Sequence, residues 1–260
     1  MSLGVSNITL AGRLQEVSLQ CRRGMVTAIC GPNGAGKSSL LSCMAGLLRP
    51  DTGDVLLGGR PLSNVSVAQK AQWIGYLPQA PEVAWDVSVE VLVSLGRLPW
   101  RNAPAKEARK AIDDAIAAMD LEDLRHRPVS RLSGGERARV LMARLLATQP
   151  GWLLADEPFA SLDLAHAAAL MRRFRQQAKA GRGVVLVLHD LATAMNHADQ
   201  VLVLRKGRVE AEGPPEIALA GKVIHRVWNC PARWLGEPGE RALSLGLATP
   251  FLVDVSRGSV

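Results

Sequence analysis

The first part of the chain reads as a series of short strands interrupted by one helix. Apolar runs rich in β-branched residues predict strands at 5–10, 17–20, 26–30 and 55–57. Leucine and methionine side chains recur at helical spacing over 37–48, and Pro50 follows them, so this stretch is predicted to be a helix.

The pattern changes between Val87 and Leu132. Here apolar residues recur at intervals of three and four on a charged background, and β-branched runs disappear. We therefore predict an inserted helical subdomain over 86–132, flanked by the two parts of one core at 1–85 and 133–213.

Strands and helices alternate through the rest of the chain. Three apolar runs predict strands at 152–155, 184–188 and 201–204, and helical patterns occupy 137–147 and 166–180. This alternation is typical of a parallel sheet covered by helices on both faces, so we expect a single α/β domain. Residues 214–260 are rich in Pro and Gly and are predicted to form an accessory segment with a helix near 215–220.

Composition is that of a globular protein. Hydrophobic residues make up 48% of the chain and charged residues 21%, which excludes global disorder. No apolar run approaches the roughly 18 residues needed to span a bilayer, and the N-terminus lacks a signal-peptide pattern. We therefore expect any membrane association to go through a partner. The four cysteines show no CxxC spacing, which favours reduced thiols over a metal site or a disulfide framework.

The chain is basic, with a net charge of +7 and a pI near 9.7. This charge suits an anionic partner such as a nucleotide, nucleic acid or acidic membrane surface, although solubility alone explains it equally well. Aromatic residues are only 4% of the chain, which argues against a nucleic-acid surface built from stacked aromatic rings.

A glycine-rich turn between a predicted strand and a predicted helix matches the phosphate-loop pattern at 31–38. Glycines let backbone N–H groups close around phosphates, and the helix N-terminus adds positive potential. Lys37 is expected to reach the outer phosphates, and the Ser38 hydroxyl to ligate Mg²⁺. The nucleotide-binding residues predicted here are Gly31, Pro32, Asn33, Gly34, Ala35, Gly36, Lys37, Ser38 and Ser39.

Two adjacent carboxylates follow the predicted strand at 152–155. A strand end of this kind brings an acid to the carboxyl edge of a parallel sheet. Asp156 is expected to hold Mg²⁺, and Glu157 to orient and deprotonate an attacking water. By itself the pair would more often be a solvated strand end, and the phosphate loop favours the functional interpretation.

A second glycine turn opens a helix at Leu132-Ser133-Gly134-Gly135-Glu136, so the chain has two helix starts suited to anions. With this motif between the phosphate loop and the acidic strand end, the sequence resembles the ATP-binding-cassette ATPases over nearly its whole length. The resemblance implies a P-loop NTPase cassette, with a mainly parallel sheet, an N-terminal antiparallel β region and an inserted helical subdomain. It also implies ATP and Mg²⁺ as ligands.

The same resemblance assigns further site residues. Gly75-Tyr76-Leu77-Pro78-Gln79 matches the family's glutamine loop, which places Gln79 near Mg²⁺ and the attacking water. His189 matches the switch histidine that contacts the γ-phosphate. Ala160-Ser161-Leu162-Asp163 matches the loop that crosses the dimer interface. The family dimerises head to tail, so Ser133, Gly134 and Gly135 are expected to complete the nucleotide site of a second copy.

A few positions depart from the family pattern. Ala138, Phe159 and Ser39 stand where other residues are usual. Residues 1–30 contain no Phe, Trp or Tyr, whereas the family usually stacks adenine on an aromatic residue before the phosphate loop. We therefore expect the base to be held loosely, by aliphatic groups or by Arg13.

Within the family, the segments around Val87–Glu90, Leu95–Pro99 and Ser161–His166 resemble ATPase subunits of bacterial iron-siderophore, haem or cobalamin importers. This implies a separate membrane permease dimer, a periplasmic or lipid-anchored substrate-binding protein, and a peripheral position on the cytoplasmic face of the inner membrane. No nucleic-acid partner is expected. The alternatives are a soluble ATP-operated clamp or assembly factor on nucleic acid or protein complexes, and a purely regulatory nucleotide-binding module. Glu157 and His189 argue against the regulatory module.

Overall fold

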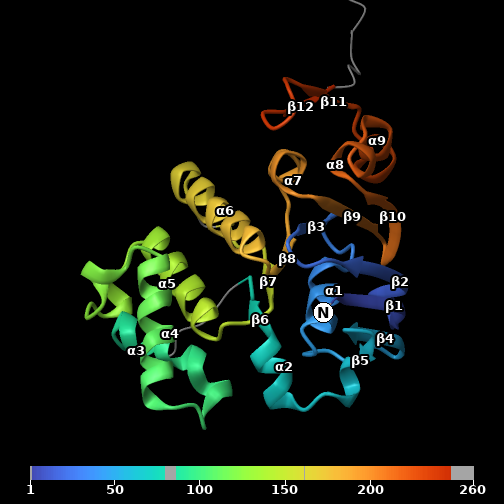
Figure 1. The fold of residues 1–260 in the computed structure, drawn as a ribbon. Coiled ribbons are helices and arrows are strands. Elements are labelled where there is room, and N and C mark those ends of the chain that lie inside the picture. The colour runs from blue at the N-terminus through green and yellow to red at the C-terminus, as the bar shows by residue number, and fades with distance from the viewer. Residues whose placement is uncertain (1, 80–85, 161, 247–260) are drawn as a thin grey trace, which may run out of the picture.

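The computed structural model describes residues 2–79, 86–160 and 162–246. Its centre is a six-stranded sheet in the order β10-β9-β3-β8-β7-β6 (Figure 1). The strands are β3 (Val26–Cys30), β6 (Ile74–Leu77), β7 (Trp152–Asp156), β8 (Gly183–Val187), β9 (Gln200–Arg205) and β10 (Arg208–Gly213). Neighbouring strands are parallel except β9 and β10, which form an antiparallel hairpin. Strands β3, β7 and β8 are buried throughout, as continuous apolar runs predict for a sheet covered on both faces.

An antiparallel sheet covers part of one face. Its order is β2-β1-β4-β5, with strands β1 (Leu3–Leu10), β2 (Leu14–Cys21), β4 (Thr52–Leu57) and β5 (Arg60–Pro61). Helix α1 (Lys37–Met44) shares one apolar core with this sheet and with Ile29 and Leu154 of the central sheet. The helix is shorter than the predicted 37–48, because Gly46 adopts a left-handed conformation (φ 71°) and turns the chain. Leu47 is consequently 63% exposed.

Helices α5 (Gly134–Ala147), α6 (Leu164–Lys179) and α7 (Leu191–His197) belong to the core on the other face. There the alternate side chains of the sheet, such as Leu153 and Leu186, share one cluster with Phe174 of α6. Because successive strand residues point to opposite faces, the continuous apolar runs supply both cores at once.

The segment predicted to be helical between 86 and 132 contains α3 (Val89–Ser94), the 3-10 helix η2 (Leu95–Trp100), α4 (Ala105–Ala118), η3 (Glu122–Leu124) and η4 (Val129–Arg131). We call this segment the helical lobe. It packs on α5, and α2 (Val67–Trp73), after η1 (Leu62–Asn64), contacts η2.

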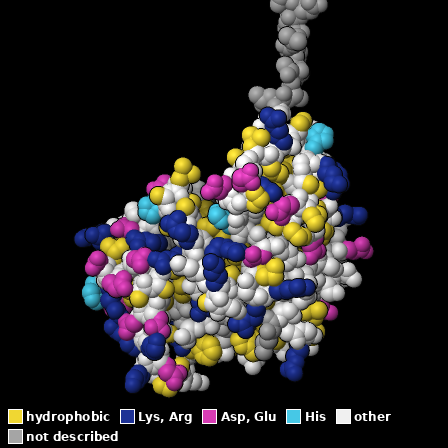
Figure 2. Space-filling model, turned by 45° about the horizontal axis from the view of Figure 1, so that its top comes forward, with side chains coloured by type: hydrophobic (Ala, Val, Ile, Leu, Met, Phe, Trp, Pro, Cys, Tyr) yellow, Lys and Arg dark blue, Asp and Glu magenta, His cyan; other side chains and the backbone are white. Residues whose placement is uncertain are grey.

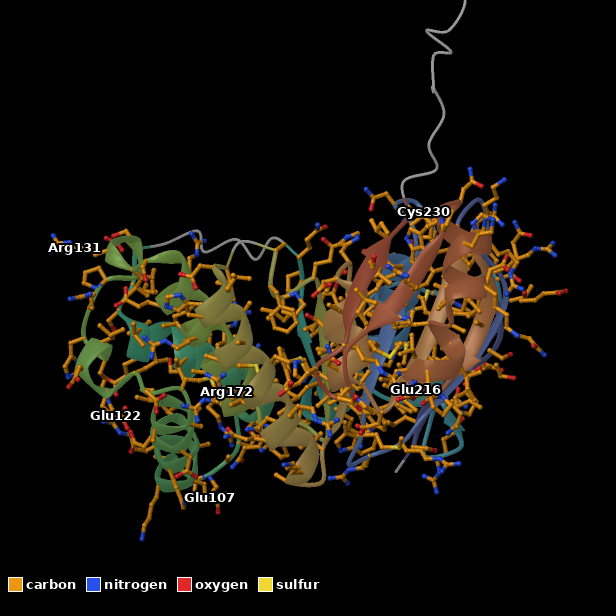
Figure 3. All side chains as sticks on the ribbon, turned by 90° about the horizontal axis from the view of Figure 1, so that it is seen from above. Glu107, Glu122, Arg131, Arg172, Glu216 and Cys230 are labelled. Carbon is orange, nitrogen blue, oxygen red and sulfur yellow. The ribbon has the colours of Figure 1, made fainter. Side chains whose placement is uncertain are left out.

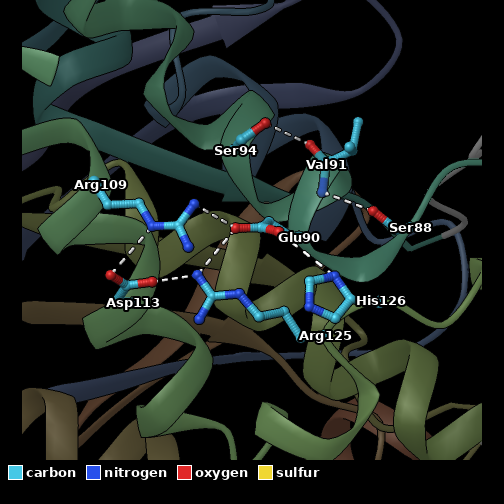
Figure 4. Close-up of polar contacts among 8 residues, drawn as sticks. All are labelled: Ser88, Glu90, Val91, Ser94, Arg109, Asp113, Arg125 and His126. Atoms are coloured by element: carbon cyan, nitrogen blue, oxygen red, sulfur yellow. Dashed lines mark hydrogen bonds and ion pairs between the residues drawn. The ribbon is translucent and has the colours of Figure 1, made fainter.

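An ion network ties the helical lobe together (Figure 4). Glu90 of α3 lies 2.7 Å from Arg109 of α4 and 3.0 Å from Arg125, which follows η3. Arg125 also pairs with Asp113, and His126 lies 3.8 Å from Glu90. The hydrogen bond from Arg125 is the main cause that lowers the pKa of Glu90 and of Asp113. Ion pairs thus hold together segments of the helical lobe that are separated in sequence. The periodicity of apolar residues does not predict these pairs.

The C-terminal segment contains α8 (Pro215–Ala218), α9 (Gly221–Trp228) and a hairpin of β11 (Ala232–Leu235) and β12 (Ala242–Leu245). Helix α8 lies within the predicted 215–220, whereas α9 and the hairpin were not predicted. Residues 247–260 of the predicted accessory segment lie outside the described residues. Glu216 and Cys230 lie at this end of the molecule, opposite Glu107, Glu122 and Arg131 of the helical lobe (Figure 3).

No helix in the described parts of the chain combines the length and apolar character needed to cross a bilayer. On the face in Figure 2, Lys and Arg side chains are interspersed with Asp and Glu. The basic excess is spread over this face and does not form one continuous patch.

Candidate functional site

The glycine-rich loop after β3 is formed by residues that close packing requires to be glycine. Gly36 precedes α1 with φ 99°, and a Cβ there would lie 2.6 Å from the carbonyl oxygen of Arg13. A Cβ on Gly31 would lie 2.2 Å from the carbonyl oxygen of Leu204. Only glycine fits both the conformation and the space. The loop is therefore held between the β1–β2 turn and strand β9.

The buried side chain of Lys37 bonds back to the first residues of this loop. It is 5% exposed, and its Nζ donates hydrogen bonds to the carbonyl oxygens of Gly31 (2.9 Å) and Pro32 (3.0 Å). Burial lowers the pKa of Lys37, and the nearby carboxylates of Glu157 and Asp156 oppose that shift. The ammonium group is thus placed at the loop beside two acids.

Asp156 ends β7 and is 3% exposed. Its Oδ1 is buried and has no hydrogen-bond partner among the described residues. Burial raises the pKa of Asp156, while a hydrogen bond from Ser38 and the charge of Lys37 act in the opposite direction. A buried carboxylate oxygen without a partner is unfavourable unless a cation or donor compensates it. Ser38 and Asp156 together therefore fit a hard, oxygen-preferring cation such as Mg²⁺.

The three predicted catalytic side chains lie together, and Gln79 and His189 both contact Glu157. Gln79, which follows β6, donates a hydrogen bond from Nε2 to Glu157 Oε2 at 2.7 Å. His189, which follows β8, contacts Glu157 Oε1 through Nε2. Glu157 itself has a left-handed backbone (φ 49°), which is uncommon for a residue with a Cβ. Such backbone strain is typical of functional positions.

These groups line one cleft of about 700 Å³. The predicted site residues that line it are Asn33, Gly34, Ala35, Gly36, Lys37, Ser38, Ser39, Gln79, Glu157 and His189. Gly31 and Pro32, at the start of the loop, do not line the cleft, and their carbonyl oxygens accept hydrogen bonds from Lys37. The cleft therefore combines the glycine-rich loop, the cationic side chains of Lys37 and Arg13, and a carboxylate held by an amide and an imidazole.

Ser133, Gly134 and Gly135 do not line this cleft. Ser133 caps α5 in a reciprocal capping box: its Oγ accepts from Glu136 N (3.2 Å), and Glu136 Oε2 accepts from Ser133 N (2.8 Å). Ser133 and Gly134 are exposed, whereas Gly135 is buried. This helix start is therefore an anion-suited surface of its own.

Asp163 also lies outside the cleft. It caps α6 by accepting the backbone N–H of His166 at 2.8 Å, and this bond is the main cause that lowers the pKa of Asp163. The next residue, Leu164, is 91% exposed. Ser161 of the same predicted loop lies outside the described residues.

Gly12 and Gly207 also belong to the site, and sequence reasoning missed both. Gly12 and Arg13 line the cleft, and Gly207 N–H donates to the carbonyl oxygen of Ala35 at 3.1 Å. Each glycine lies in a turn between two strands. A glycine between two β-rich runs predicts such a turn, so the sequence could have indicated both turns. Their proximity to the phosphate loop depends on tertiary packing.

The chain resembles known proteins over most of its length. Residues 14–160 match the ABC transporter family model. The hemin import ATP-binding protein HmuV of Streptomyces coelicolor is 42% identical over 243 residues, which cover 92% of this chain and 87% of the relative.

Solved structures agree in fold. The cbiO1 protein of Clostridium perfringens, part of the ABC transporter complex cbiONQ, aligns with a TM-score of 0.77 at 31% identity, covering 87% of this chain and 94% of that one. An ATP-binding cassette solved as a dimer in a post-hydrolysis state with ADP and phosphate aligns with a TM-score of 0.72 at 26% identity, covering 82% and 98%. Together with the clustered phosphate loop and acidic strand end, these matches show that the chain belongs to the ABC transporter family and is one of its ATPases.

Proposed function

We propose that this chain is the ATP-hydrolysing subunit of a bacterial haem or iron-chelate importer. The observation that carries the ATPase mechanism is that Lys37, Gln79, Glu157 and His189 line one cleft. The buried carboxylate of Asp156 interacts electrostatically with Lys37. The importer class is supported by the 42% identity to a protein named for hemin import.

In this proposal the loop over 31–39 holds the triphosphate through its backbone N–H groups and Lys37. Ser38 and Asp156, with Gln79, would hold Mg²⁺, which would shield the phosphate charge. Glu157 accepts a proton from the attacking water, because Gln79 and His189 hold its carboxylate at the cleft wall. With ATP bound, His189 contacts the γ-phosphate.

Two copies are proposed to pair head to tail. Ser133, Gly134 and Asp163 are exposed and lie outside their own cleft, and Leu164 offers an apolar side chain beside them. In this arrangement a second copy brings the phosphates of its bound ATP to the start of α5, which suits anions. The second copy also covers Leu164. Each ATP then lies between the phosphate loop of one copy and the glycine motif of the other.

A permease is proposed to dock where α2 meets the helical lobe. Two further clefts lie there, of about 410 and 900 Å³, and both are lined by Ala71, Leu98 and Pro99. Val67 is 82% exposed and Leu98 is 55% exposed. This attachment would place the chain peripherally on the cytoplasmic face of the inner membrane. A periplasmic or lipid-anchored substrate-binding protein would act through the permease.

Copurification from detergent-solubilised membranes of the native host tests the importer role. The tagged protein should capture a multi-helix permease, and Val67→Asp/Leu98→Asp should lose it while the purified subunit keeps its ATPase rate. Ile217→Asp, at a side chain 63% exposed near the C-terminal end, is the matched control. Capture of nucleic acid or soluble complexes instead would support the clamp alternative.

Transport by the captured complex tests the substrate class. In proteoliposomes, MgATP should drive uptake of hemin in preference to cobalamin or a ferric siderophore. Uptake of cobalamin or a siderophore without uptake of hemin would be consistent with the ATPase mechanism and would overturn the assignment of haem as substrate.

A further inference from the structure

The imidazole of His166, on the first turn of α6, lies against Gly135 at the start of α5. A Cβ on Gly135 would lie 2.3 Å from His166 Cδ2 and 2.6 Å from both Cγ and Nε2. Real Cβ atoms do not approach other heavy atoms so closely, so the ring occupies the space that a side chain would need. Gly135 does not have a positive φ, so this contact accounts for its being glycine.

Asp163 fixes the orientation of that ring. Nδ1 of His166 lies 2.8 Å from both carboxylate oxygens of Asp163, and Asp163 Oδ1 also accepts the backbone N–H of His166. A carboxylate is an acceptor only, so it selects the state in which Nδ1 carries a proton. The opposite edge of the ring, with Cδ2 and Nε2, therefore faces Gly135.

A continuous chain of contacts thus runs from Asp163 through His166 to the helix start of α5. At that helix start Ser133 is held by its capping box with Glu136, and Glu136 lies 3.6 Å from Arg127 of the helical lobe. The Asp163 loop and the glycine motif come from different segments, and His166 joins them within one protomer. Because the ring fills the space beside Gly135, movement of the start of α5 toward α6 would have to displace it.

We propose that His166 is a positioning residue of the ATPase reaction. It sets the glycine motif relative to Asp163, so that both reach the second copy in one fixed geometry. The inference rests on the dimeric ATPase function proposed above. His166 acts on the site through Gly135 and Asp163 and does not line the cleft of its own protomer.

His166→Ala tests this with purified protein and MgATP. We expect kcat to fall by about tenfold to a hundredfold, the loss typical of a misplacement of about 1 Å. ATP affinity of the monomer should stay within about twofold, because the cleft is untouched. His166→Asn, whose Nδ2 can replace the Nδ1 donor to Asp163, should recover part of the loss. His225→Ala, at an exposed histidine on α9, is the matched control and should keep the wild-type kcat.

The packing on Gly135 is tested by a double-mutant cycle. Gly135→Ala should lose activity because its Cβ meets the imidazole, and adding His166→Ala should cost little more, since the ring has gone. If the fold-loss of kcat in the double variant equalled the product of the two single losses, the packing role would be overturned. A wild-type kcat in His166→Ala would overturn the proposal as a whole. Either outcome leaves the proposed function intact, because that function is tested separately, by ATP hydrolysis in the wild-type protein and by copurification with a permease.

Discussion

At the residue scale, the two neighbouring carboxylates differ in surroundings. Asp156 is buried with an oxygen that has no partner among the described residues, and burial raises its pKa because it disfavours the charged carboxylate. Glu157 is held by an amide and an imidazole that follow two other strands. This division suits one acid to a cation and the other to a water molecule.

Glu157→Gln should keep ATP binding and lower turnover by about 10²–10⁴-fold, because the water loses its base while Lys37, Ser38 and Asp156 remain. Phosphate release and nucleotide titration measure the two quantities, and gel filtration with MgATP should show a persistent dimer. Glu122→Gln is the control, since Glu122 lies on the helical lobe (Figure 3). Hydrolysis near the wild-type rate would remove Glu157 from the catalytic role.

No aromatic side chain from the described residues lines the cleft, and Gly12 and Arg13 lie where the chain approaches the phosphate loop. Aromatic stacking of a base is worth about 1–3 kcal/mol, and the described residues of the cleft supply no Phe, Tyr or Trp for it. ATP and GTP should therefore bind within about tenfold of each other, which is ~1.4 kcal/mol.

Arg13→Tyr should tighten ATP binding without altering the maximal rate, because the new contact is equal in the ground and transition states. Fluorescence titration of both nucleotides measures this, with Arg22→Tyr, at an exposed arginine, as the control. An ATP preference far above tenfold in the wild type would show that another group reads the base.

At the scale of elements, the Glu90 network makes the helical lobe one unit. Glu90 and Arg125 side chains are each 21% exposed, so their pairing is partly shielded from water. Because the folded-state pKa of Glu90 and of Asp113 is lowered, their contribution is fully present above the unfolded values near 4. It is lost as the pH falls through the lowered folded-state values.

Arg125→Met should lower the free energy of unfolding by about 1–2 kcal/mol at pH 7. The difference from wild type should narrow as the pH falls below the unfolded-state values near 4, and it should disappear only below the lowered folded-state values, where the acids are protonated in both states. Urea denaturation across this range measures it. Lys110→Met removes an exposed pair to Asp114, with side chains 74% and 56% exposed, and should change stability by less than about 0.5 kcal/mol. Equal effects of the two substitutions would contradict the role of the network.

At the scale of the whole molecule, the proposed head-to-tail dimer requires one chain to contribute to two different nucleotide sites. The cleft holds the phosphate loop and the acids, whereas the exposed start of α5 and Asp163 lie outside it. A substitution at the exposed start of α5 should therefore lower turnover without changing the affinity of the monomer for nucleotide.

Ser133→Arg should abolish hydrolysis through bulk and charge at the dimer interface and leave ATP affinity of the monomer within about twofold, because Ser133 does not line the cleft. Mixing this variant with excess Lys37→Ala should restore activity, since such heterodimers contain one intact composite site. Titration and phosphate release measure both effects. A strong loss of ATP affinity in the Ser133→Arg monomer would contradict the arrangement in trans.

Local sequence determined most of the buried strands and the chemistry predicted for the site, whereas α2, β6, α7, β10, α9 and the β11–β12 hairpin were not predicted from it. Buried runs such as Trp152–Asp156 were predicted to be strands because a short, continuous apolar run that alternates with helical patterns suits a parallel sheet covered on both faces. The glycines at 31, 34 and 36 signalled a phosphate loop because their positive φ is a local requirement. The matched family supports the same identification.

Only the tertiary structure decided which segments meet. The order of strands places Gln79 and His189 on either side of Glu157, and the packing of α6 on α5 places His166 against Gly135. Helix α9 and the Glu90 network also depend on partners distant in sequence. Periodicity reports what each residue prefers locally, whereas contacts between distant segments are selected by the burial and charge pairing of the whole chain.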